Sequence, residues 1–313
     1  MQYAFFPSLK GLSNALICGG LPLDSCEVID LESSATTCKN LPDFPITVRP
    51  SFGGLGFKGK PIICGGTILY FILSNRCYSF ENNEWVPSVN MSSKRSSAAA
   101  AQMQDGKLLV TGGYDGSHLK SAEMLTEEGW ESNIPSLPVT IYGHCMVTVN
   151  STTVMAIGGT QNDQYSGKTF YFTTGAKSWT EGPEMKYNRT GHSCGRIRRN
   201  KDSQGTSIIV VGGYNDKLQR IVSSVEILNE GSNEWQRGPE LPLSIWFSQM
   251  VEDPNGGVVL IGGYSPSDVI LDTLYHLPHG GQDAVWTKME QKMKTGRQEH
   301  TAFLVPDDVV DCS

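Results

Sequence analysis

Short apolar runs recur along this chain, and each ends at a pair of glycines. Runs such as 15–18, 108–111 and 258–261 are four residues long and mostly apolar, a length typical of buried β-strands and too short for helices. The pairs are Gly19-Gly20, Gly65-Gly66, Gly112-Gly113, Gly158-Gly159, Gly212-Gly213 and Gly262-Gly263. Successive pairs lie roughly 46 to 54 residues apart, and a period of this size indicates a repeat architecture.

The same order of elements follows each glycine pair. A second strand-like stretch comes next, and then a tryptophan about 17 to 23 residues after the second glycine. These tryptophans are Trp85, Trp130, Trp179, Trp235 and Trp286, with Cys38 at the corresponding place in the first unit. A turn and another apolar strand then lead to the next pair. The pattern therefore predicts four short strands in each unit, a to d, with the glycine pair at the end of strand b.

Stacking of these units follows from the size of one unit. A lone four-stranded sheet cannot bury both of its faces, so the units must pack against one another. Closing the stack into a ring leaves only short outer edges, and a large aromatic residue on strand d can fill the wedge between neighbouring sheets. The sequence predicts an all-β fold, a six-bladed β-propeller with four antiparallel strands per blade, built as one domain over residues 1–313.

The two ends of the chain offer two ways to complete the first unit, which lacks a strand a before residues 15–18. Residues 297–305 match the strand a of other units, yet no glycine pair follows them. We therefore expect this C-terminal strand to complete the first blade, which would remove a free sheet edge. Residues 2–6 are the alternative closing strand.

The repeated motif resembles a known family. Residues 111–116, Thr-Gly-Gly-Tyr-Asp-Gly, with Trp130 behind them, resemble the kelch repeat, as do residues 212–214 with Trp235. The stretch from Gly65-Gly66 through Tyr78 to Trp85 is similar. The resemblance covers nearly the whole chain and implies a kelch-type propeller, a fold that mostly presents its loops to a peptide or a folded partner. The paired Trp-Asp and Gly-His signature of the rival WD-type propeller is missing.

Charge and hydropathy exclude several classes of function. The net charge of −7 argues against nucleic-acid binding, and no apolar run reaches transmembrane length. Residues 1–17 lack a basic segment and a small-residue cleavage site, so they are more typical of an early strand than of an export signal. We expect a monomer that does not insert into membranes.

Cysteines are placed alike in two units. Cys18 and Cys64 each precede a glycine pair, and Cys26 and Cys77 each lie near the start of the following strand c. Strands b and c pair antiparallel, so these positions should face one another at a bridgeable distance, which predicts two hairpin disulfides. Buried free cysteines are the alternative.

The other four cysteines follow no such repeat. A bond between Cys38 and Cys312 could close the ring. Cys145 and Cys194 follow His144 and His192 by one and two residues, so the period-two alternation of strands points them to opposite faces. We expect Cys145 and Cys194 to be free and buried.

The compartment stays open at this stage. The cysteine hairpins resemble those of extracellular invertebrate kelch proteins, and sequons begin at Asn90, Asn150 and Asn188. Both features favour a secreted or extracellular protein. The absence of a recognisable export signal favours the cytoplasmic alternative.

No motif of catalysis or cofactor binding stands out. The glycine pairs are followed by neither a helix nor a lysine, so they are not phosphate cradles. His144, His192 and His300 share one place near the start of strand a, where three imidazoles around a channel could ligate a metal. Because other residue types fill that place in the remaining units, we expect these histidines to be structural, and we expect no catalytic residue, metal or cofactor.

The strongest binding signal lies in the d–a and b–c loops, which emerge on one face of the ring. The candidate partner-binding residues are Arg49, Arg95, Arg189, Arg297, Tyr114, Tyr214, Tyr264 and Trp246. Arginine, tyrosine and tryptophan are enriched at binding hot spots, and a ring of arginines could recognise an acidic or phosphorylated segment. Alternatively, the arginines brace loops against backbone carbonyls. A basic insertion at 196–205 could also dock an acidic partner, although a solvated hairpin is the plainer interpretation.

The sequence thus predicts a non-catalytic protein-interaction module that binds a protein or peptide, possibly an acidic one, through this loop face. A metal-dependent oxidase or lyase on a kelch scaffold is one alternative. The substrate-recognition part of a ubiquitin-ligase adaptor is another, and it would need residues outside this chain.

Overall fold

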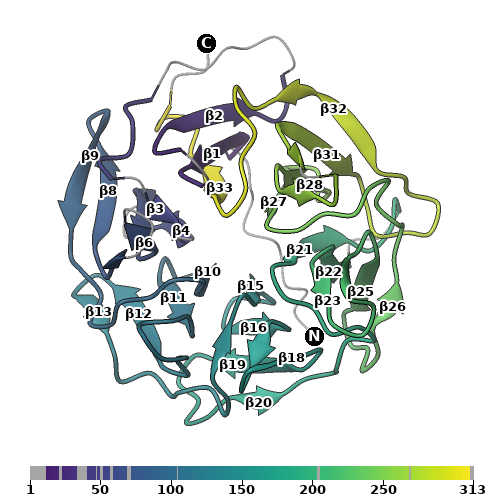
Figure 1. The fold of residues 1–313 in the computed structure, drawn as a ribbon, viewed down its shortest axis with the longest axis horizontal. Coiled ribbons are helices and arrows are strands. Elements are labelled where there is room, and N and C mark those ends of the chain that lie inside the picture. Colours follow the sequence, from purple (N-terminus) through teal and green to yellow (C-terminus); the bar gives the residue numbers. More distant parts are fainter. Residues whose placement is uncertain are drawn as a thin grey trace.

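The computed structural model arranges β-sheets in a ring (Figure 1). It describes residues 12–20, 23–33, 41–46, 48–49, 52–56, 59–68, 72–103, 105–202, 205–267 and 269–310. We number the repeat units one to six by their glycine pairs. No helix in the described part of the chain is long and apolar enough to cross a membrane.

Units two to six each form a four-stranded antiparallel sheet in the order a-b-c-d. Unit two holds β4 (Phe52–Leu55), β5 (Pro61–Cys64), β8 (Cys77–Glu81) and β9 (Glu84–Ser88). Unit three holds β10 (Ala99–Gln102), β11 (Leu108–Thr111), β12 (Ala122–Thr126) and β13 (Gly129–Glu131). Unit four holds β15 (Cys145–Thr148), β16 (Thr153–Ile157), β19 (Thr169–Thr173) and β20 (Thr180–Glu181). Unit five holds β21 (Ser193–Arg198), β22 (Thr206–Val211), β25 (Val225–Asn229) and β26 (Gln236–Arg237). Unit six holds β27 (Gln249–Glu252), β28 (Val258–Ile261), β31 (Thr273–Leu277) and β32 (Thr287–Lys292).

Unit one is assembled from both ends of the chain. β1 (Asn14–Cys18) lies between β2 (Cys26–Asp30) and the C-terminal β33 (Thr301–Val305), and both pairings are antiparallel. Each inner strand contacts the inner strand of the next sheet, and β33 contacts both β27 and β4. The alternative closing strand at residues 2–6 lies outside the described residues.

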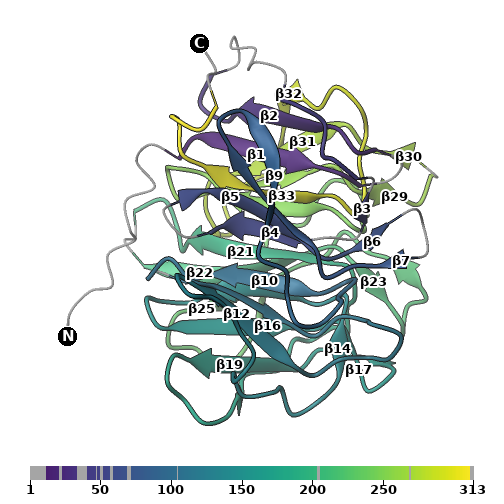
Figure 2. The ribbon, with the colours of Figure 1, turned by 90° about the vertical axis from the view of Figure 1, so that its left-hand side faces the viewer.

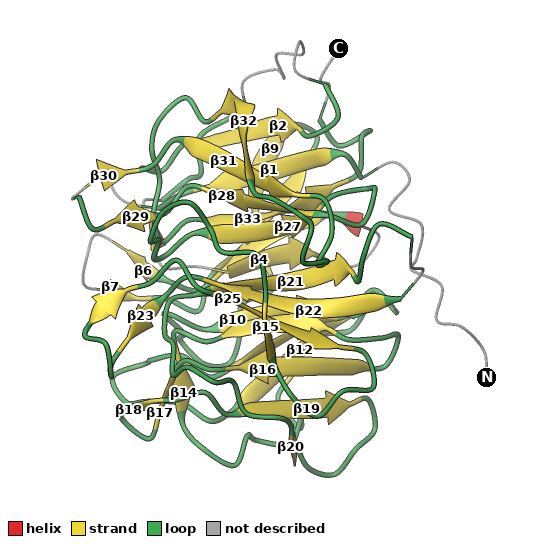
Figure 3. Ribbon diagram, turned by 90° about the vertical axis from the view of Figure 1, so that its right-hand side faces the viewer, coloured by secondary structure: helices red, strands yellow, loops and turns green. Residues whose placement is uncertain are grey.

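Short hairpins extend from the b–c loops and gather on one face of the ring (Figures 2 and 3). The hairpins are β6 (Thr67–Ile68) with β7 (Ile72–Leu73), β17 (Thr160–Gln161) with β18 (Gln164–Tyr165), β23 (Tyr214–Asn215) with β24 (Arg220–Ile221), and β29 (Tyr264–Ser265) with β30 (Val269–Ile270). From the d–a segments, β3 (Val48–Arg49) pairs with β6 and β14 (Ile141–Tyr142) pairs with β17. The a–b turns lie on the opposite face because strands a and b are antiparallel.

The core lies between neighbouring sheets. The b strands are buried along their length, as in β11, β22 and β28, because both faces of each sheet are covered. Indole groups link the units: Trp130, Trp179, Trp235 and Trp286 donate from Nε1 to the carbonyls of Val89, Pro135, Pro183 and Pro239, respectively. Each acceptor belongs to the segment that leaves the preceding unit, so the repeated tryptophan fixes one sheet against the next.

The glycine pairs let the d–a turns approach closely. Gly112 and Gly113 have φ values of +61° and +94°, and a Cβ on Gly113 would lie 2.8 Å from the carbonyl oxygen of Ser96. Only glycine combines this backbone conformation with the required space. The pairs are therefore packing devices for the loops on the hairpin face.

The structure contains both hairpin disulfides. Cys18 bonds to Cys26 and Cys64 bonds to Cys77, and each pair of Cα atoms is 4.2 Å apart at directly facing positions. Cys38 and Cys312 lie outside the described residues.

The prediction that Cys145 and Cys194 are free is wrong, because they form a disulfide with their Cα atoms 6.0 Å apart. Strand alternation does place them on opposite faces of their own sheets. However, the front of one sheet packs against the back of the next, so residues on opposite faces of units four and five meet. This bond therefore joins two units at the inner end of their sheets.

Candidate partner-binding face

Three of the four candidate arginines are buried. Arg95 and Arg189 have no exposed surface, and Arg297 is 2% exposed. Each guanidinium pairs with a buried carboxylate on strand c of the unit that it precedes: Glu123, Glu226 and Glu27, respectively. The prediction that these arginines contact a partner is wrong, and they offer no basis for an acidic partner.

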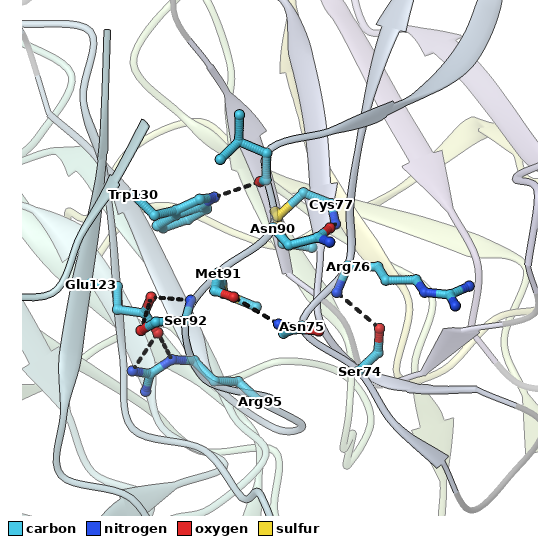
Figure 4. The surroundings of a disulfide bond; sticks show 12 residues. Ser74, Asn75, Arg76, Cys77, Asn90, Met91, Ser92, Arg95, Glu123 and Trp130 are labelled. Carbon is cyan, nitrogen blue, oxygen red and sulfur yellow. Dashed lines mark hydrogen bonds and ion pairs between the residues drawn. A yellow bond between two sulfur atoms is a disulfide. The ribbon is translucent and has the colours of Figure 1, made fainter. Parts of the chain in front are cut away.

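Each of these arginines makes the same set of hydrogen bonds. Arg95 Nη1 donates to the carbonyls of Gly112 (2.7 Å) and Ser121 (3.0 Å), and its Nη2 donates to Ser121 Oγ (2.8 Å) and Glu123 Oε1 (3.0 Å). Figure 4 shows this pair in the surroundings of Cys77, which bonds to Cys64, with Ser92 also donating to Glu123. Burial lowers the pKa of Arg95, and the attraction of Glu123 opposes that effect. The brace is thus a satisfied, loop-fixing network.

Arg297 carries the same brace across the two ends of the chain. Its Nη1 donates to the carbonyls of Gly19 (2.8 Å) and Ser25 (2.9 Å), its Nη2 to Ser25 Oγ (2.8 Å) and its Nε to Glu27 (3.0 Å). The segment before β33 therefore relates to unit one as the d–a segments relate to units three and five. The side chain of Arg49, in β3, is outside the described part of the structure.

The three histidines are packing residues between units. His144 Nε2 lies 2.8 Å from Thr111 Oγ1, and His192 Nε2 lies 3.1 Å from the carbonyl of Ile157, in each case in the preceding unit. Burial, with nearby arginine charge, lowers the pKa of His144, His192 and His300 from 6.5 to about 3. In the described part of the chain, no three His, Cys, Asp or Glu side chains are grouped to hold a metal ion.

Four aromatic rings form a continuous cluster on the hairpin face, which we call the aromatic cluster: Tyr165, Tyr214, Trp246 and Phe247. Successive ring centroids are 5.7, 5.6 and 4.1 Å apart, and the last two rings are stacked. All four side chains are partly exposed. Such rings offer a large contact area with little entropy to lose on binding.

Trp246 is fixed from both sides. Its backbone exchanges two hydrogen bonds with Tyr264, of 2.9 and 2.7 Å. Its indole lies over Gly191, where a Cβ would collide with Nε1 and where φ is +62°. Trp246 is therefore held in place within the cluster, and a side chain that is already ordered would lose little entropy on contact with a ligand.

Phe247 belongs to a line of left-handed residues that joins the d–a turns of successive units. Ser97, Gly143, Gly191, Phe247 and Glu299 all have φ between +53° and +62°. Hydrogen bonds join successive members of this line. The amides of Gly143, Gly191, Phe247 and Glu299 each donate to the carbonyl of the preceding member at 2.8–3.2 Å. Phenylalanine rarely adopts this conformation, and such strained residues cluster at functional sites.

Tyr114 lies in a second, smaller group. Its ring centroid is 5.5 Å from that of His118, which stacks on Tyr142 at 4.5 Å and pairs with Asp163. Tyr114 is 39% exposed. The sequence reasoning missed Tyr165, His118 and Tyr142, although aligning the units would have revealed Tyr142, which occupies the place of Trp246.

Inside the ring, the inner strands surround a cavity of about 810 Å³. Its wall includes Ala98, Met146, Met250, Phe303 and the Cys145–Cys194 bond.

In the basic insertion, Arg196 is held by Glu252 of unit six at 2.9 Å. Arg199 and Lys201 are exposed, as expected for a solvated hairpin.

Comparison with known proteins points to one family. Residues 202–242 match the model of the Kelch motif. The chain is 25% identical to Kelch-like protein 26 of Danio rerio over 182 residues, which are 55% of this chain and 28% of that protein. It is 26% identical to Kelch-like protein 36 of Bos taurus over 210 residues, 61% of this chain and 31% of that protein. The chain thus matches less than a third of the length of either relative.

Among solved structures, that of YjhT aligns with a TM-score of 0.72 at 13% identity, over 89% of this chain and 95% of that one. An identity this low supports the likeness of fold alone. Together with the repeated glycine pairs and interlocking tryptophans, these matches support a kelch-repeat family and a β-propeller fold for this chain.

Proposed function

We propose that this chain is a six-bladed propeller, closed by its C-terminal strand, that binds a protein or peptide without catalysing a reaction. The pairing of β33 with β1 supports the closure, as does the brace from Arg297 to unit one. The binding surface is the hairpin face, with the aromatic cluster as its anchor.

The aromatic cluster carries this proposal. In units one, three and five the d–a turn holds a buried arginine, but in unit six Ile245 takes that place and Trp246 and Phe247 follow it. Large, partly exposed rings that depart from the repeat are not needed to build a unit. Tryptophan and tyrosine in fixed positions are typical binding anchors.

The hairpin face suits an apolar or aromatic side chain of the partner better than an acidic one. The rings of the cluster offer stacking partners, and Leu218 at the neighbouring hairpin tip is 47% exposed. The guanidinium groups of Arg95 and Arg189 are occupied by Glu123 and Glu226. A peptide segment with aromatic, proline or aliphatic residues is the expected ligand class.

A displayed library of random peptides, selected on the folded protein, tests this function. The variant Trp246→Thr/Phe247→Gly, which carries the residues of unit five at these places, is the matched comparison, and Lys201→Ala on the opposite face is the control. We expect selected peptides to share an apolar side chain and to bind the double variant about 30-fold more weakly, as at a hot spot of about 2 kcal/mol.

Two results would overturn the proposal. One is a set of selected peptides that bind wild-type protein and the double variant equally. The other is stoichiometric copper or iron in elemental analysis of the purified protein, which would indicate a metal-dependent enzyme.

A further inference from the structure

We propose that Asn150 carries an N-linked glycan, attached in the oxidising secretory pathway. Residues 150–152, Asn-Ser-Thr, form the turn between β15 and β16 on the a–b face. The tripeptide is a glycosylation acceptor sequence, and Ser151 and Thr152 are both exposed. The proposal is independent of the partner-binding role.

The side chain of Asn150 is already arranged as an acceptor. Its Oδ1 accepts hydrogen bonds from the amides of Thr152 (3.0 Å) and Thr153 (3.0 Å) and from Thr152 Oγ1 (3.3 Å). Its Nδ2 makes no hydrogen bond within the described residues. A sugar on Nδ2 would therefore leave all three hydrogen bonds in place, and the fold tolerates it.

The reaction needs a lipid-linked oligosaccharide as its second substrate. The Nδ2 of Asn150 forms a bond to the anomeric carbon of the sugar, while the bond from that carbon to the diphosphate oxygen breaks. Nδ2 loses one proton to the solvent, and the lipid diphosphate leaves with the bonding electron pair. No oxidant or reductant is required.

The disulfides supply an independent reason to place the chain in such a compartment. Cys18–Cys26, Cys64–Cys77 and Cys145–Cys194 bond within the described residues. Disulfides persist in oxidising compartments and are rare in the cytosol. Cys145 begins β15, the strand that leads directly into the Asn150 turn.

The other two sequons are built into the fold. In the sequon at Asn188, Arg189 has no exposed surface and Thr190 is 7% exposed, with Oγ1 bonded to the carbonyl of Gly143 at 3.3 Å. In the sequon at Asn90, the hydroxyl of Ser92 donates to Glu123 at 2.7 Å as part of the arginine brace. A glycan must be tolerated by the finished fold, and Asn150 meets this requirement with the fewest contacts at risk.

This position has a consequence for the surface. The a–b turns lie opposite the short hairpins, so a glycan on Asn150 covers the face that lacks the aromatic cluster. The hairpin face stays open to a partner. Glycosylation would thus restrict docking to one side of the ring.

Peptide mapping of the native chain purified from its source is the test. Peptide N-glycosidase in heavy-oxygen water converts a glycosylated asparagine into labelled aspartate, so labelled Asp at position 150 is the expected result. An unmodified Asn150 in the native protein would overturn the proposal.

Recombinant variants of this chain, directed into the secretory pathway of a eukaryotic host by an added signal peptide, assign the modification. Thr152→Ser keeps the acceptor sequence and should keep the glycan, whereas Thr152→Ala should lose it. Asn150→Asp keeps the shape and the Oδ1 acceptor but has no Nδ2, so it should fold and migrate as the deglycosylated protein does. Equal mass loss on deglycosylation for wild type and Asn150→Asp would contradict the assignment.

Discussion

Units five and four satisfy the same backbone groups with different side chains. In unit five, Arg189 donates to the carbonyls of Gly212 and Ser224, both at 2.8 Å. In unit four, Ile141 stands at the place of the arginine, and Gln161 from the b–c hairpin donates to the matching carbonyls of Gly158 (2.9 Å) and Lys168 (3.2 Å). The fold therefore requires that these buried carbonyls be satisfied, whichever residue does so.

The second difference lies at the carboxylate. Glu226 on β25 balances Arg189, whereas Phe170 occupies the corresponding position on β19. Units with the arginine and glutamate have a polar brace, and a unit without them has an apolar contact. Residues that repeat with the unit thus hold it together, whereas Trp246 departs from the repeat and takes no part in the brace.

Breaking the brace should have the largest effect on stability. Arg189→Ile leaves Glu226 buried without a counter-charge, and removing one partner of a buried ion pair costs about 3–5 kcal/mol. Urea unfolding followed by circular dichroism at pH 7 measures the loss in the free energy of unfolding.

The double variant Arg189→Ile/Glu226→Phe sharpens this comparison, because it copies unit four. We expect it to be more stable than Arg189→Ile alone, since no unpaired carboxylate remains. Recovery stays incomplete without a counterpart of Gln161. If the double variant were less stable than the single one, the carboxylate would not be the source of the loss.

The brace could have been predicted from the sequence more fully than it was. Units one, three and five share Ser-x-Glu at the start of strand c: Ser25 to Glu27, Ser121 to Glu123 and Ser224 to Glu226. The same three units have an arginine before strand a, and this correlation favours a structural pair. Arg49 matches the other arginines in position alone, because Tyr78 takes the place of the glutamate in unit two.

Other features could not be derived from one unit at a time. The repeat period and the facing cysteines are local patterns, so the fold and the hairpin disulfides follow from them. Contacts between units depend on which sheet faces meet. Cys145 and Cys194 can pair because opposite faces of units four and five pack against each other. The aromatic cluster joins Tyr165 of one loop to Trp246 of another, and short hairpins of two-residue strands leave little periodic signal.

The disulfide between units should contribute more stability than a hairpin disulfide. Cys145 and Cys194 are separated by 49 residues, and Cys18 and Cys26 by 8. Loop-closure entropy in the unfolded chain gives about 4 kcal/mol for the longer loop and about 2.5 kcal/mol for the shorter one. Differential scanning calorimetry of variants that lack either bond should show the larger fall in Tm for the bond between units.

Residues from unbonded units make matched replacements for these cysteines. Cys145→Ala/Cys194→Met copies Ala99 and Met146, which share a core cluster between units three and four. Cys18→Thr/Cys26→Ala copies the facing pair Thr111 and Ala122. A larger fall in Tm for the hairpin variant would show that local packing outweighs loop entropy.

Each buried histidine should contribute less to the free energy of unfolding than the brace or a disulfide, and this contribution should depend on pH. Burial holds the pKa of His144 near 3 in the folded protein, against 6.5 in an unfolded chain, so the unfolded state binds more protons between these values. The stabilisation is fully present above pH 6.5 and is lost as the pH falls toward 3. Between pH 7 and pH 5, one such histidine should account for about 2 kcal/mol of lost stability. In His144→Ala, which copies Ala98 of unit three, urea unfolding at the two pH values should show a loss smaller by that amount. An unchanged pH dependence would mean that His144 is protonated in the folded protein, and the packing of its imidazole between units would then need a different explanation.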